Sequence, residues 1–204
     1  MKFIFVHIPK CGGTTVIKTM STLLANPLHI YPASKLDTIA DDVLFNSNFI
    51  ACHATLPHFK KRFGKKIENY KLITSLRNPV DRYLSEWHTW QRGGHKETWD
   101  QYLNFPLNNN AITNFLTGTK NDVFCPRKTE AVFLQFHKIF TMDDLSVQLF
   151  YFLEETGFVD YKIQTANRNG VDQTLDKPTL HKMIQNNLKD LKVWDYFTHN
   201  FRGH

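Results

Sequence analysis

The sequence contains few cysteines, with only three among its 204 residues. Cys11, Cys52 and Cys125 are too few for a disulfide framework, and their spacing matches no zinc-binding motif. The sequence therefore excludes a small disulfide-stabilised secreted domain, and it offers no ligand set for a metal ion. A reducing compartment is the simpler expectation.

Long apolar segments are also missing. The first hydrophobic run, Phe3 to Val6, ends at His7, and no run approaches the ~20 apolar residues of a membrane span. The pattern predicts neither a secretory signal nor an integral membrane segment, so we expect a soluble cytoplasmic protein. The Golgi lumen is the alternative location if the sequence is a truncated part of a longer protein.

Positive charge is in excess but is not concentrated in one place. The formal net charge is +6, and the densest basic clusters are Lys60 to Arg62 and the pair Lys65 and Lys66. The excess favours acidic partners, such as nucleotides or sulfated and carboxylated glycans. No cluster is dense enough to predict nucleic-acid binding. The sequence does not indicate an oligomeric state.

The chain does contain short apolar runs that alternate with helical patterns. Four strands are predicted, at Phe3–Val6, Phe49–Cys52, Lys71–Leu76 and Lys138–Thr141. Such alternation predicts an α/β fold with a mostly parallel central sheet and helices on both faces. Because no internal repeat or linker is visible, we expect one P-loop-type domain over residues 1–204.

The helices expected between and after these strands are defined by apolar periodicity and by capping residues. The last of them is either continuous or interrupted near Asp190. The expected helices cover Val16–Leu24, Ser34–Asp42, Pro79–Arg92, Thr98–Phe105, Ala111–Leu116, Thr129–Phe136, Leu145–Thr156 and Pro178–Phe197. The basic stretch from Pro57 to Lys66 is expected to form a helical turn and a loop.

The stretch from His7 to Thr15 joins the first expected strand to the first expected helix. A glycine-containing turn in this place lets backbone N–H groups converge on an anion at the helix N-terminus. Gly12 and Gly13 permit the backbone angles, and Lys10 adds a mobile positive charge. The lysine precedes both glycines, unlike the lysine of the ATPase motif. The stretch predicts a phosphate-binding loop, with an ordinary strand–helix turn as the alternative.

Cys11 lies inside this loop, and its role has two interpretations. A thiol beside Lys10 and a helix N-terminus can have a lowered pKa and be sensitive to oxidation. Alternatively, Cys11 is a small residue that fills the turn.

A second anion site is predicted at the end of the third expected strand. Arg77 follows that strand, and Ser85 lies about two turns into the helix that begins at Pro79. The two side chains can bind an anionic group together. In the alternative interpretation, Arg77 only caps the edge of the sheet and Ser85 is exposed to solvent. Because the carboxyl ends of parallel strands meet at one edge, we expect Lys10, His53 and Arg77 to converge there.

These motifs resemble those of a known family. Phe5 to Thr15 resembles the 5′-phosphosulfate loop of carbohydrate sulfotransferases that use 3′-phosphoadenosine 5′-phosphosulfate (PAPS), and Leu76 to Trp87 resembles their 3′-phosphate motif. The continuation from Trp90 to Gly94 is most similar to the heparan sulfate 6-O-sulfotransferases. Asn167 and the stretch from Leu191 to Tyr196 resemble the closing segment of the family.

The resemblance implies in-line transfer of a sulfuryl group from PAPS to a hydroxyl of an acidic carbohydrate, without a metal. His53 is at the position of the family's catalytic histidine and is the expected general base, with a core histidine as the alternative. Lys10 is expected to stabilise the leaving group. The residues implied in PAPS binding are Lys10, Cys11, Gly12, Gly13, Thr14 and Thr15 at the phosphosulfate, and Arg77 and Ser85 at the 3′-phosphate.

The sequence also departs from the family pattern. Cys11 stands where threonine is common, and Asn78 replaces a frequent aspartate. The chain is shorter than the membrane-anchored Golgi enzymes, so a soluble enzyme that acts on another glycan is equally compatible. Rival functions are a kinase-like enzyme with a degenerate phosphate loop and a non-enzymatic glycan-binding module. Arg92, His95 and Lys96 are either acceptor contacts or part of a solvated loop.

Overall fold

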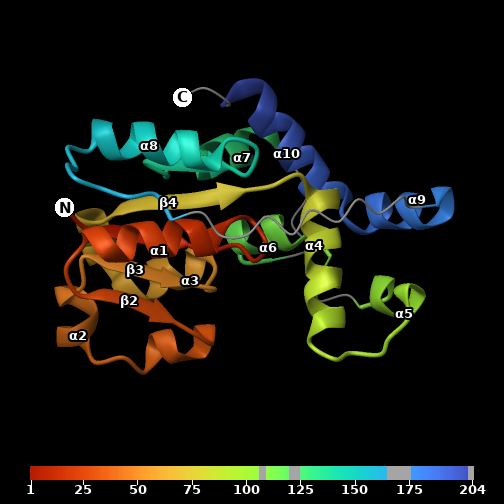
Figure 1. Cartoon of the computed structure of the whole chain (residues 1–204), viewed down its shortest axis with the longest axis horizontal. Coiled ribbons are helices and arrows are strands. Elements are labelled where there is room, and N and C mark those ends of the chain that lie inside the picture. The colour runs from red at the N-terminus through yellow and green to blue at the C-terminus, as the bar shows by residue number, and fades with distance from the viewer. Residues whose placement is uncertain (106–108, 120–124, 165–175, 202–204) are drawn as a thin grey trace.

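The computed structural model describes residues 1–105, 109–119, 125–164 and 176–201. Its centre is a five-stranded sheet in the order β2-β3-β1-β4-β5, in which every neighbouring pair is parallel (Figure 1). This confirms the predicted fold class. The strands are β1 (Phe3–Val6), β2 (Pro27–Ile30), β3 (Phe49–Cys52), β4 (Lys71–Leu76) and β5 (Lys138–Thr141).

The edge strand β2 is absent from the sequence-based prediction, which has four strands. Three of its four residues are exposed or only half-buried, so it shows no continuous apolar run. Pro27 follows the first helix and indicates its end rather than a strand, yet proline is tolerated as the first residue of an edge strand. The four strands predicted correctly are each buried at half or more of their positions.

Helices surround this sheet and follow most of the predicted ranges. Residues 34–42 were expected to form one helix, but they divide into a 3₁₀ helix and the start of α2. The helices are α1 (Gly13–Leu23), α2 (Asp41–Asn46), α3 (Leu56–Phe63), α4 (Pro79–Arg92), α5 (Trp99–Leu103), α6 (Ala111–Thr117), α7 (Pro126–Phe133), α8 (Leu145–Glu155), α9 (Lys177–Asn186) and α10 (Leu188–Asn200), with 3₁₀ helices η1 (Ala33–Asp37) and η2 (Gly64–Asn69).

The break in the C-terminal helix is at Asn187, between α9 and α10. The side chain of Asn187 turns back to Met183 O and also accepts a hydrogen bond from the N–H of Asn110. Asp190, near which the interruption was predicted, lies inside α10 and is buried. Asn167 falls outside the described residues.

Two apolar layers enclose the sheet. Phe3 and Phe5 of β1 pack on one face with α1 and α8, whereas Ile4 and Val6 pack on the other with α3, α6, α7 and α10. This alternation is the period of two that a strand imposes on its side chains. Within the described ranges, every helix falls short of the length and hydropathy that a bilayer crossing requires.

Strand register brings the residues that follow the strands to one edge. Val6 pairs with both Cys52 and Thr74, and Leu76 pairs with Thr141, so the strands end at nearly the same level. Figure 1 shows α4 beyond the arrowhead of β4, at this carboxyl edge. Parallel α/β sheets bind their ligands at such an edge.

Candidate functional site

Packing determines the shape of the loop between β1 and α1. A Cβ on Gly12 would lie 2.2 Å from the Sδ of Met142, and Gly12 has a positive φ of 81°. A Cβ on Gly13 would lie 2.0 Å from the Nε2 of His7. Because neither position has room for a side chain, the two glycines let α1 begin in direct contact with the sheet edge.

The first turn of α1 presents backbone N–H groups with no acceptor. The N–H groups of Thr15 and Val16 donate to the carbonyl of Gly12, at 3.0 and 3.5 Å. Those of Gly13 and Thr14 form no hydrogen bond with any described residue, and α1 has neither a side-chain cap nor an acidic residue in its first turn. Unpaired N–H groups and the helix dipole favour an anion at this position.

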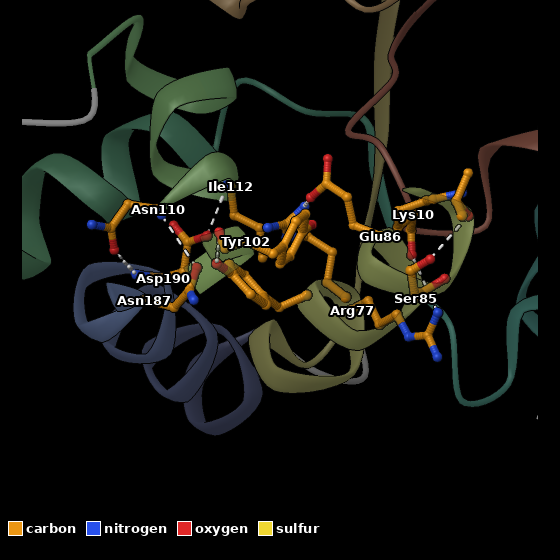
Figure 2. A network of polar contacts seen from close by, with 12 residues as sticks. Lys10, Arg77, Ser85, Glu86, Tyr102, Asn110, Ile112, Asn187 and Asp190 are labelled. Carbon is orange, nitrogen blue, oxygen red and sulfur yellow. Dashed lines mark hydrogen bonds and ion pairs between the residues drawn. The ribbon is translucent and has the colours of Figure 1, made fainter. Parts of the chain in front are cut away.

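Two cations lie beside this turn. Nη1 of Arg77 donates to the backbone carbonyl of Lys10 at 3.4 Å, which joins the end of β4 to the loop. Burial lowers the pKa of the Lys10 ammonium, Glu86 opposes that effect, and Arg92 and Arg77 reinforce it. Figure 2 shows Lys10, Arg77 and Ser85 grouped at the N-terminal half of α4.

His53 lies directly after β3 at the same edge. Burial lowers its pKa to about 4, and the positive charges of His29 and Lys10 act in the same direction. Its imidazole is therefore neutral at pH 7. Lys10, His53 and Arg77 thus lie at one edge, as the sequence predicts for their positions.

The structure decides between the two interpretations of Cys11. The residue is fully buried in the core layer, and burial raises the pKa of its thiol to about 12. The interpretation of a lowered thiol pKa is therefore wrong, because desolvation outweighs the nearby positive charges of Arg82 and Arg77. Cys11 fills the turn.

Sequence reasoning missed a buried polar network that supports α4. Arg82 is fully buried, and its Nη1 donates to Oε2 of Glu86 at 2.6 Å, a spacing of four residues that a helical wheel could have indicated. Asp190 of α10 accepts hydrogen bonds from the N–H groups of Ile112 and Thr113 in the first turn of α6 (Figure 2). No local signal links residues so far apart in the sequence.

The residues considered as acceptor contacts lie at the end of α4. The side chains of Arg92, His95 and Lys96 are exposed, and the ring of His95 stacks on that of Trp90 at 3.8 Å. Arg92 donates to Thr89 Oγ1 at 3.4 Å, and its charge lowers the pKa of Lys10. Arg92 is therefore electrostatically connected to the site.

A comparison with protein families matches residues 1–146 to the model described as the sulfotransferase family. This range holds the glycine loop, His53, Arg77 and α4. The chain belongs to the sulfotransferase family. Members transfer sulfuryl groups, and the unpaired N–H groups and cations at the sheet edge of this sulfotransferase are consistent with that chemistry. No match was found among curated proteins.

Two solved sulfotransferase structures match this chain. The crystal structure of a sulfotransferase from Alicyclobacillus acidocaldarius matches with a TM-score of 0.58 and 11% sequence identity. The match covers 98% of this chain and 96% of the Alicyclobacillus chain. The crystal structure of a mouse sulfotransferase in complex with PAP matches with a TM-score of 0.48 and 15% sequence identity. This match covers 90% of the present chain and 62% of the mouse chain. The first likeness supports the assignment of the fold.

Proposed function

We propose that this sulfotransferase moves the sulfuryl group of PAPS to a hydroxyl of a carbohydrate, with His53 as the general base. The observation that carries the proposal is the group of unpaired N–H donors at Gly13 and Thr14, flanked by the cations Lys10 and Arg77. A neutral imidazole at the same edge adds a proton acceptor. Membership of the sulfotransferase family indicates sulfuryl transfer, and the proposal assigns the individual roles in that reaction to these residues.

The donor set fits PAPS. The N–H groups of Gly12, Gly13 and Thr14 and the ammonium of Lys10 would hold the phosphosulfate, which supplies the activated sulfuryl group when bound. Arg77 and Ser85 would hold the 3′-phosphate. No acidic side chain in the first turn of α1 opposes an anion there. Among the described residues, no group of three or more potential ligands is arranged to hold a metal ion.

Each residue has a defined task in the proposed transfer. His53 accepts the proton of the acceptor hydroxyl while that oxygen forms its bond to sulfur. The bond between sulfur and the phosphate oxygen breaks, and its electron pair stays on that oxygen. Lys10 neutralises the charge that develops there, and the first-turn N–H groups hold the phosphate in place.

The carbohydrate acceptor is supported by the stretch from Trp90 to Gly94, which resembles the heparan sulfate 6-O-sulfotransferases. Arg92 lies in this stretch, and its exposed positive charge suits an acidic glycan. We propose the 6-O-sulfation of such a glycan as the specific reaction. Another glycan would use the same catalytic residues.

The test is incubation of the protein with labelled PAPS and a panel of glycans and small hydroxyl compounds. His53→Ala is compared with His58→Ala, which removes a histidine on α3 whose ring contacts Asp37. We expect the wild type and His58→Ala to label a glycan. His53→Ala should show no transfer while it keeps its affinity for PAP, the desulfated product.

The other outcomes separate the rival functions. Turnover by His53→Ala would remove His53 as the base. Transfer only to small compounds would exclude a carbohydrate acceptor. A thermal shift with ATP and magnesium, but none with PAP, would favour a kinase-like enzyme. Binding of PAP and glycan without transfer would favour a non-enzymatic binding module.

A further inference from the structure

His7 and His53 form a contact between two imidazole rings. Both follow neighbouring parallel strands, and the N–H of His7 donates to the carbonyl of Cys52 at 3.1 Å, which extends the ladder by one step. The ring centroids lie 4.0 Å apart, with 33° between the planes. One face of His53 is therefore covered by His7.

His7 itself is held on several sides. Its side chain is only 8% exposed, and its ring stacks on Phe5 at 5.3 Å. Its Nε2 lies so close to Gly13 that no Cβ would fit between them. The flat five-membered ring thus fills the space between the loop and His53, a space with little room for a larger ring. Burial lowers the pKa of His7 to about 3, so it is neutral at pH 7.

No carboxylate of the described residues forms a hydrogen bond that would orient His53. In a Ser-His-Asp site a buried aspartate holds the histidine by a hydrogen bond. Here no described residue forms a hydrogen bond with the imidazole of His53. Its ring instead lies beside those of His7, Tyr31 and Phe115, and the ring centroids of Tyr31 and Phe115 are 5.8 and 6.4 Å from that of His53. Ring packing is therefore what orients it.

We propose that His7 is a positioning residue for His53, which it orients by ring contact and shields from water on its inner face. The inference rests on the proposed function, because it assigns His7 a task in that site. The titratable groups that face His53 are His7 from β1, His29 and Tyr31 from the β2 side, and Lys10 from the loop. Among these, His7 makes the closest ring contact with His53.

The test measures the pKa of His53 by NMR of histidine-labelled protein, together with kcat and KM for PAPS. In His7→Ala, water reaches the exposed face of His53, so its pKa should rise by about one unit or more towards its ordinary value. The lost orientation should lower kcat by about ten-fold or more, with little change in KM. A purely structural role would leave the pKa of His53 unchanged in the folded protein.

A matched control is His137→Ala. His137 also has a pKa lowered by burial, but it precedes β5 and lies at the opposite edge of the sheet. This variant should change neither the pKa of His53 nor kcat. A second variant, His7→Leu, keeps a similar volume without the flat ring. It should keep the His53 pKa near that of the wild type and lose part of kcat.

Three results would overturn the proposal. The first is an unchanged His53 pKa and kcat in His7→Ala. The second is complete loss of turnover in a folded His7→Leu that binds PAP, since His7 would then take part in the chemistry directly. The third applies if His7→Ala does not fold. In that case the measurement is made on His7→Leu, and a rise of the His53 pKa to 6.5 in this variant would overturn the proposal. The NMR measurement needs no turnover, so it stands even if the proposed reaction is not found.

Discussion

Arg77 and Lys10 are 67 residues apart in the sequence, yet Nη1 of Arg77 donates to the carbonyl oxygen of Lys10 at 3.4 Å. Lys10 has a positive φ of 67°, which turns its carbonyl out of the direction of the strand. The contact links the two motifs proposed to bind the donor, one after β1 and one after β4. A change at either residue is therefore expected to affect how the donor is held.

Removal of the Arg77 guanidinium should weaken binding of PAP and PAPS far more than binding of adenosine 5′-phosphosulfate, which has no 3′-phosphate. A hydrogen bond to a charged group is worth about 1.5–3 kcal/mol, or roughly a ten- to hundred-fold loss for Arg77→Ala. Calorimetric titration with both nucleotides measures the difference. Arg62→Ala, which removes a guanidinium that pairs with Asp41 on α2, is the control. Equal losses for both nucleotides would contradict the 3′-phosphate assignment.

Donor binding should raise the pKa of His53. The positive charge of Lys10 contributes to the lowered value of about 4. An anion bound at Lys10 offsets that charge and favours the protonated imidazole, which moves the pKa of the base towards neutrality. NMR titration of His53 with and without PAP measures the change. A pKa that stays near 4 under saturating PAP would place the anion away from Lys10.

The stability of the protein should fall as the pH decreases below 6.5. The pKa of His7 is about 3 in the folded chain and near 6.5 in the unfolded chain, so between these values the unfolded chain binds more protons. The His7 contribution is fully present above pH 6.5. It falls by about 2 kcal/mol at pH 5, since each pKa unit corresponds to about 1.4 kcal/mol.

Urea denaturation at pH 7.5 and pH 5 measures this pH dependence. His7→Leu removes the titrating group and should show a smaller difference between the two pH values. His53 retains its own lowered pKa in that variant and continues to contribute. An identical pH dependence in the wild type and His7→Leu would show that His7 is not buried in its neutral form.

Asp190 should be far more important for stability than Asp195, which lies further along the same helix, α10. Asp190 is fully buried and accepts three hydrogen bonds, from Ile112 N, Thr113 N and Thr113 Oγ1, at 2.7 to 2.9 Å. Its removal leaves these three donors without their acceptor and takes one of two nearby carboxylates from the buried guanidinium of Arg82, which keeps its ion pair with Glu86. We expect Asp190→Ala to lower the free energy of unfolding by about 3–5 kcal/mol.

Asp195→Ala is the matched control on the same helix. Its carboxylate is 73% exposed and near His199, so the change should be within about 0.5 kcal/mol. Chemical denaturation of both variants gives the comparison. Similar stabilities would show that the buried network does not hold α10 to α6.

Prediction from sequence worked where the signal was local. The buried strands β1, β3, β4 and β5 show as apolar runs, and α4 shows through Asn78, whose side chain accepts from the N–H of Val80 at 2.9 Å. β2 was missed because an edge strand is half-exposed and has no such run. The helix break was expected near Asp190 and lies at Asn187, whose side-chain oxygen accepts from the N–H of Asn110, a residue 77 positions away that no local pattern indicates.

The sequence by itself determined the two candidate motifs, because a glycine loop before a helix and an arginine after a strand depend only on neighbouring residues. Tertiary structure decided what surrounds them. It buried Cys11 and raised the pKa of its thiol, placed His7 against His53, and supported α4 through Arg82. Desolvation and ring contact depend on atoms that are brought together only by folding, so no local pattern encodes them.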